Sequence, residues 1–226
     1  MNNIDVNSYL EVALDEIRNR NWALTKQYLE VNEVEVKNNH FIYDRYELDV
    51  EEQLITFYFN VKGERYFFVI SVRLNKKEIA GIWMENAHKC YLTATSEKLS
   101  LQELSKLTKL KYSDGWSKGD LRKNGKSNYN FSRINFRFHS HESYDLETIL
   151  NEVLNELEKD KDGILELSKK SNAYISICRH QYISANAGIS LDIPTINKLS
   201  NLNLGIDIDT YIVGKEIKDI EEAKES

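Results

Sequence analysis

The chain contains few of the residues that mark several common protein classes. Among its 226 residues there are two cysteines, Cys90 and Cys178, and a single proline. Two scattered cysteines provide neither a disulfide framework nor a zinc knuckle, so we expect buried free thiols. No apolar run reaches the ~20 residues that cross a bilayer. The N-terminal sequence also lacks the basic and apolar segments of a signal peptide, which predicts a cytoplasmic protein with no membrane partner.

The composition is that of a globular protein that builds its own core. Apolar residues make up 41% of the chain and charged residues 29%, which excludes an intrinsically disordered protein. At about 150 residues per domain, the length predicts one large domain or two small ones. The formal net charge of −6 argues against a protein that coats nucleic acid.

Hydrophobic periodicity predicts a first unit over residues 1–88. Apolar residues recur at helical spacing between residues 5 and 20, and a second helical stretch covers 22–29. Alternation of apolar and polar residues then replaces the helical period, and charged turns separate the alternating runs. We expect an antiparallel β-meander with strands over residues 40–48, 54–61, 66–74 and 79–84.

The following residues predict a second unit over 89–214 with the order β-α-β-α-β-β-α-β, an α+β sandwich. Its helices have chemical start signals: a capping box from Ser100 to Glu103, a cap at Asp145, and Pro194 in a first turn. Residues 109–128 are expected to form a long loop, and the charged tail at 215–226 is expected to fray. The expected strands cover residues 90–95, 130–139, 174–179, 188–191 and 204–213.

Four segments of the second unit occur in an order that is similar to a known family. They are the helix sequence SLQELSKL, the run from Trp116 to Asp120, and the segments 186–191 and 202–211. Over about residues 90–213 they resemble the bacterial family catalogued as domain of unknown function 4279. The resemblance implies a small bacterial α+β module, sometimes encoded near toxin systems, and it assigns no catalytic residue. Residues 1–88 lie outside it.

One basic segment contrasts with the acidic chain. Eight basic residues and two acids lie between Lys109 and Arg137, interleaved with aromatic residues. Basic side chains beside rings that can stack are suited to a phosphate-bearing ligand or to single-stranded nucleic acid. The alternative is a solvated loop whose rings close the edge of the core. The candidate ligand contacts are Trp116, Lys118, Gly119 and Arg122.

An acidic cluster in the first unit is the second candidate surface. Carboxylates crowd one expected strand and turn beside two tyrosines, and they could face a basic protein partner. The alternative is a turn that charge keeps soluble. The candidate partner-binding residues are Tyr43, Asp44, Tyr46, Glu47 and Asp49.

Two further patterns are weaker. His139 and His141 share a strand face and could bind one metal ion, which would suit a metal-dependent hydrolase, although both residue types are common on the surface before a helix. Asp207 and Asp209 also share a face, but alternation with isoleucines explains them as a solvent-facing row.

The residues contain no nucleophile with its base, no complete metal set and no cofactor motif, so we predict a protein that is not an enzyme and needs no cofactor. The leading hypothesis is a bacterial immunity protein that binds and neutralises a basic toxin through its acidic cluster. The alternative is a module that binds a phosphorylated small molecule or nucleotide through residues 109–137. Monomer and dimer both stay open.

Overall fold

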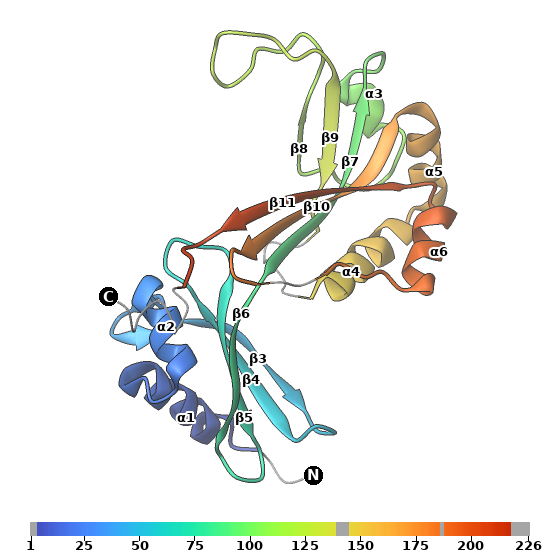
Figure 1. The fold of residues 1–226 in the computed structure, drawn as a ribbon. Coiled ribbons are helices and arrows are strands. Elements are labelled where there is room, and N and C mark those ends of the chain that lie inside the picture. The colour runs from blue at the N-terminus through green and yellow to red at the C-terminus, as the bar shows by residue number, and fades with distance from the viewer. Residues whose placement is uncertain (1–3, 139–144, 186–187, 218–226) are drawn as a thin grey trace. The chain divides into compact units, whose positions relative to one another are not determined.

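The computed structural model describes residues 4–138, 145–185 and 188–217 and divides into two compact units (Figure 1). The first unit comprises residues 1–87 together with the later segments 180–186 and 211–226. The second comprises residues 88–179 and 187–210. Both units combine helices with β-sheet, so the predicted α+β class is confirmed.

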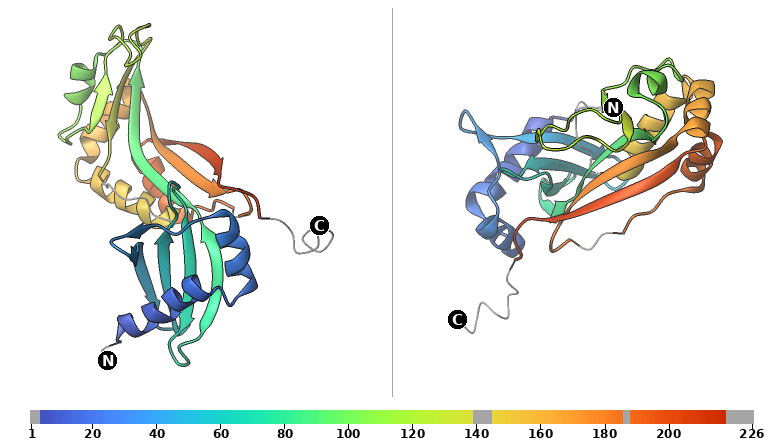
Figure 2. Two further views of the ribbon diagram at one scale, coloured as in Figure 1. Left: turned by 90° about the vertical axis from the view of Figure 1, so that its left-hand side faces the viewer. Right: turned by 90° about the horizontal axis from the view of Figure 1, so that it is seen from above.

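The first unit confirms the predicted helices and meander, except that the strand expected over residues 40–48 is divided between two sheets. Helices α1 (Val6–Asn19) and α2 (Ala23–Val31) precede a short hairpin of β1 (Val36–Lys37) and β2 (His40–Phe41). An antiparallel sheet with the strand order β3-β4-β5-β6 follows. Both helices lie against one face of this sheet, as the left view of Figure 2 shows. Its strands are β3 (Tyr43–Asp49), β4 (Leu54–Asn60), β5 (Phe67–Arg73) and β6 (Ile79–Glu85).

Apolar residues of β4 and β5 build the core of the first unit. Phe57, Phe59 and Phe68 have no exposed surface, and they pack in one cluster with Ala13 and Ile17 of α1. Removing a large side chain of this kind from water stabilises the fold by about 1.5–3 kcal/mol.

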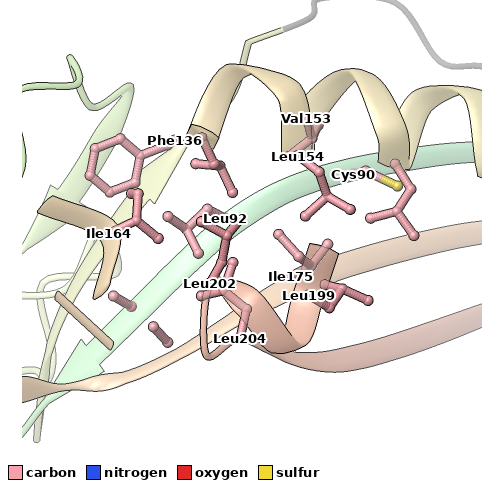
Figure 3. Packing of buried hydrophobic residues seen from close by; sticks show 14 of the residues in the cluster. Cys90, Leu92, Phe136, Val153, Leu154, Ile164, Ile175, Leu199, Leu202 and Leu204 are labelled. Carbon is pink, nitrogen blue, oxygen red and sulfur yellow. The ribbon is translucent and has the colours of Figure 1, made fainter. Parts of the chain in front are cut away.

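The second unit is a five-stranded sheet with helices on one face. The strand order is β11-β10-β7-β9-β8. Helices α4, α5 and α6 lie along one side of it (Figure 1), and their leucines pack against the apolar residues of β7, β9 and β10 (Figure 3). The elements are β7 (Ala87–Ser96), α3 (Leu101–Ser105), β8 (Asp114–Trp116), β9 (Ser132–Phe136), α4 (Leu146–Glu158), α5 (Lys161–Lys170), β10 (Asn172–Tyr182), α6 (Ile193–Asn201) and β11 (Gly205–Val213).

The predicted helix starts are confirmed by their hydrogen bonds. At α3 the Ser100 hydroxyl accepts from the Glu103 amide at 3.3 Å, and the Glu103 carboxylate accepts from the Ser100 amide at 2.8 Å. Asp145 accepts from the Glu147 amide at the start of α4, and Pro194 lies in the first turn of α6. Among the described residues, no helix is long and apolar enough to cross a membrane.

Two expectations about strands were wrong. Residues 114–116 lie in the predicted loop but form β8, whose middle residue Gly115 pairs with Ile134 of β9. A strand of three residues is too short for an alternating pattern to be recognised. Conversely, residues 188–191 form no strand, although Ile189 and Leu191 alternate with polar residues. Leu191 instead packs against the core from an irregular segment.

We predict that Gly115→Ala destabilises the protein. A Cβ atom at this position would collide with the carbonyl oxygen of Arg133 and lie 2.6 Å from Cδ1 of Leu101. Because a backbone carbonyl cannot rotate away, the cost should be about 1–3 kcal/mol of unfolding free energy, as measured by urea denaturation. Gly188→Ala is the matched control, since nothing lies within 4 Å of its added Cβ. Equal stability of the two variants would contradict the prediction.

Candidate functional site

The predicted acidic cluster lies on β3, the edge strand of the four-stranded sheet. Six of the seven β3 residues are exposed, and β3 is hydrogen-bonded to β4 along one side. We call this strand, with Asp44, Glu47 and Asp49, the acidic edge.

The structure separates the tyrosines of the acidic edge from the acids. Tyr46 pairs with the buried Phe57, so it lies toward the helix-covered face of the sheet, as Tyr43 does. Glu47 points to the opposite face, where its carboxylate accepts a hydrogen bond from the Tyr58 hydroxyl at 3.2 Å. Successive side chains of a strand point to opposite faces, and the pairing of β3 with β4 shifts by one residue after Tyr43. Together these two features separate the tyrosines from Glu47. One partner can therefore contact both groups only by following the strand edge.

The basic segment is ordered by its own rings. Tyr129 stacks on Trp116 with ring centroids 4.3 Å apart, and the guanidinium carbons of Arg122 and Arg133 lie 5.3 Å from the Tyr129 ring and 5.7 Å from the Trp116 ring. We call these four residues the ring stack. Each ring therefore already has a stacking partner and a cation over it, and ligand contact through Trp116 and Arg122 stays a prediction.

The other two candidate residues of this segment hold the loop. The Lys118 amide donates to the Ser132 hydroxyl at 2.9 Å, and its ammonium lies 3.3 Å from the Glu97 carbonyl oxygen. Gly119 has a φ of +92°, which only glycine adopts easily, and its amide donates to the Tyr129 carbonyl. Both residues thus close the turn that leads from β8 toward β9.

A row of polar side chains crosses the face of the five-stranded sheet that lies opposite α4–α6. Thr93 of β7 is fully buried, and its hydroxyl lies 2.9 Å from the Ser176 hydroxyl of β10, which donates the hydrogen bond. The Thr93 hydroxyl donates to Asn135 Oδ1 of β9 at 3.0 Å. Asn135 in turn donates to Asp114 of β8 at 2.6 Å. We call Ser176, Thr93, Asn135 and Asp114 the polar row.

The polar row positions Arg133 by neutral groups only. Arg133 Nε donates to Asn135 Oδ1 at 2.9 Å, and Nη2 donates to Thr93 Oγ1 at 3.2 Å. No carboxylate of the described residues lies within ion-pair distance of its guanidinium. Arg137, two residues along the same strand, is different, because it pairs with Asp114 and lies over the Tyr91 ring. The charge of Arg133 is therefore held in place but not neutralised.

Tyr174 of β10 lies within electrostatic reach of Arg133. Burial raises the pKa of the Tyr174 hydroxyl, the Arg133 guanidinium opposes this rise, and the carboxylates of Asp207 and Asp209 add to it. The predicted aspartate pair thus lies on exposed β11 beside a tyrosine, with both carboxylates on one strand face.

The metal hypothesis cannot be placed on this structure. His139 and His141 lie outside the described residues. Within the described ranges, no three residues among His, Cys, Asp and Glu gather closely enough to hold a metal ion.

Sequence reasoning did not identify the polar row. It placed Arg133 and Asn135 on the polar face of their strand, but Thr93, Ser176 and Tyr174 carry no local signal. Their contribution depends on the strand order β10-β7-β9-β8, which brings together segments that are far apart in the chain.

Comparison with known proteins identifies the second unit as the part with relatives. The model of the family described as Domain of unknown function (DUF4279) matches residues 86–213. The match covers more than half of the 226 residues, and the chain belongs to this family. No curated protein and no solved structure shows a significant match.

We predict that Thr93→Val destabilises the protein more than Thr95→Val. Both residues lie on β7, but only Thr93 bridges Ser176, Asn135 and Arg133. Leaving buried partners unsatisfied should cost about 1–3 kcal/mol, measured by urea denaturation. Thr95 is half-buried and its side chain makes no hydrogen bond to any residue that the structure describes, so it is the control. A similar loss in both variants would show that the polar row does not act as a connected network.

A second prediction concerns the cysteines. Burial raises the pKa of the Cys90 thiol to about 12, so at pH 8 only about one thiol in ten thousand is a thiolate. A thiol reagent at pH 8 should therefore label the partly exposed Cys178 first and label Cys90 only after unfolding. Peptide mass spectrometry distinguishes the two sites. Equal labelling rates in the folded protein would contradict this.

Proposed function

We propose that the protein is a non-catalytic interaction protein that binds a basic segment of a partner protein along the acidic edge. The exposure of β3 is the observation that carries the proposal. An edge strand offers unpaired main-chain N–H and C=O groups, so an extended segment can add to it as a further strand.

The charge of the acidic edge selects the partner. Five carboxylates and one guanidinium lie between Tyr43 and Glu52. A second copy of the chain pairing along β3 would bring like charges together, which is unfavourable. A lysine- or arginine-rich strand would instead gain from the same carboxylates, both in its association rate and in its selectivity.

Apolar side chains along the same strand add contact area on the other face. Tyr46 and Leu48 are 44% and 42% exposed, although both flank a buried core. Exposed tyrosines beside a polar rim are typical anchors of protein interfaces. A partner strand that extends along β3 would meet these side chains on one face and the acids on the other.

The finer form of the proposal is that the partner is a toxin and the chain is its bacterial immunity protein. The support is the acidic charge, which suits a toxin that itself binds anionic nucleic acid, and the resemblance described above. Neutralisation would follow from occlusion of the toxin's basic surface, without chemistry.

We predict that Glu47→Lys/Asp49→Lys abolishes capture of the partner. The full-length chain is used as bait in lysate of its source organism, and the bound proteins are identified by mass spectrometry. The wild type should recover a basic protein in stoichiometric amount, and the variant should not. Reversing the edge charge should slow association by about tenfold or more at low salt, as measured with the purified partner.

Glu11→Lys/Asp15→Lys is the matched control, because it makes the same charge change on the exposed face of α1. This control should still bind. Hydrogen exchange should show β3 amides that become protected in the complex. A partner that binds both variants equally, or that leaves β3 unprotected, would contradict the proposed surface.

A further inference from the structure

We propose a second binding site on the face of the five-stranded sheet that lies opposite α4–α6. Its ligand is a small molecule with an oxyanion (phosphate or carboxylate) that binds Arg133 and a ring that stacks on Tyr174. The site is independent of the acidic edge, since all its residues belong to the second unit. Its residues lie on the strands of the sheet, whereas the ligand contacts predicted from the sequence include the loop residues Lys118 and Arg122.

The guanidinium of Arg133 is held in a fixed orientation by hydrogen bonds. Its guanidinium donates to two neutral oxygens, one of Asn135 and one of Thr93, and it has no carboxylate partner among the described residues. Both acceptors are themselves fixed by the polar row. Nη1 makes no hydrogen bond to any described residue. A half-buried, oriented and unneutralised guanidinium is the arrangement that binds a planar or tetrahedral oxyanion, because its donors already point in a fixed fork.

The strand register identifies the residues beside this cation. Arg133 is paired with Thr95 of β7. β10 lies beside β7 in the sheet, and Figure 1 draws the two with opposite directions. The hydrogen bond between the Thr93 and Ser176 hydroxyls therefore implies that Tyr174 lies beside Thr95. Arg133 and Tyr174 therefore stand two strands apart, about 10 Å, with the small, half-buried Thr95 between them.

Tyr174 differs from the other rings of the site. Trp116 is stacked with Tyr129, and Tyr91 is covered by Arg137. Tyr174 makes no ring or cation contact within the described part of the chain. Its neighbour on β11 is Gly205, which has no side chain; an added Cβ there would lie 3.6 Å from the Tyr174 Cβ. A ligand ring can stack on Tyr174 while its anionic group reaches Arg133.

The test uses phenyl phosphate, benzoate and inorganic phosphate as probes. Each is titrated into the isotope-labelled full-length protein at low salt, and amide chemical shifts are followed by NMR. We expect saturable shifts around Arg133, Thr95 and Tyr174. Phenyl phosphate binding more tightly than benzoate identifies a phosphate site, and the reverse order identifies a carboxylate site. No saturable shift with any probe up to about 20 mM, a Kd too weak for a built site, would overturn the proposal.

Variants separate this site from general charge. Arg133→Gln places an amide donor about where Nε donates to Asn135, but it loses the charge and the terminal nitrogens. It should weaken binding about tenfold or more. Lys123→Gln is the matched control, because it removes one charge from the exposed loop, and it should change binding less than about twofold. Equal weakening in both would overturn the site.

A second variant removes the dependence on how Arg133→Gln folds. Tyr174→Leu keeps the cation and removes the stacking ring. This variant should lower the affinity for phenyl phosphate to the level of inorganic phosphate. The affinity for inorganic phosphate itself should not change. Unchanged preference for phenyl phosphate would remove Tyr174 from the site.

Discussion

The hydrogen bond between Thr93 and Asn135 is the central link of the polar row, on which the sheet face opposite α4–α6 depends. It joins β7 to β9 through side chains, and each partner extends the connection by one strand, to Ser176 and to Asp114. Because the central groups are buried, each broken bond would leave a polar atom without water or partner. The row therefore adds a side-chain hydrogen bond to the short β8–β9 ladder, and it orients Arg133.

The two faces of the five-stranded sheet differ in what they contribute to the second unit. Leu92, Ile134 and Ile175 pack beneath the helices and supply the burial that stabilises the unit. The polar row contributes less, since paired polar groups can be replaced by apolar ones of the same shape at little cost. Stability alone therefore does not require a guanidinium without a carboxylate partner among the described residues, and this is the group that the proposed anion site would use.

The sequence was sufficient where structure is decided locally. Ser100, Asp145 and Pro194 mark helix starts through features within one turn. The alternation of apolar and polar residues between 40 and 84 predicts the meander. The site was only half predictable. Alternation placed Arg133 on a polar face, but the partnership of Thr93 with Ser176 spans 83 residues and follows from strand order. The ring stack was hidden for the same reason, because only the closed turn brings Arg122 and Tyr129 onto Trp116.

The two proposed surfaces would respond differently to ionic strength. The carboxylates of the acidic edge are exposed, and mobile ions screen such charges beyond about 8 Å at physiological salt. Their main effect is therefore on the rate at which a basic partner arrives. Arg133 is half-buried and held by fixed dipoles, so salt weakens its interactions less, and its effect falls on how long an anion stays bound. Salt dependence thus provides a physical distinction between them that needs no knowledge of either ligand.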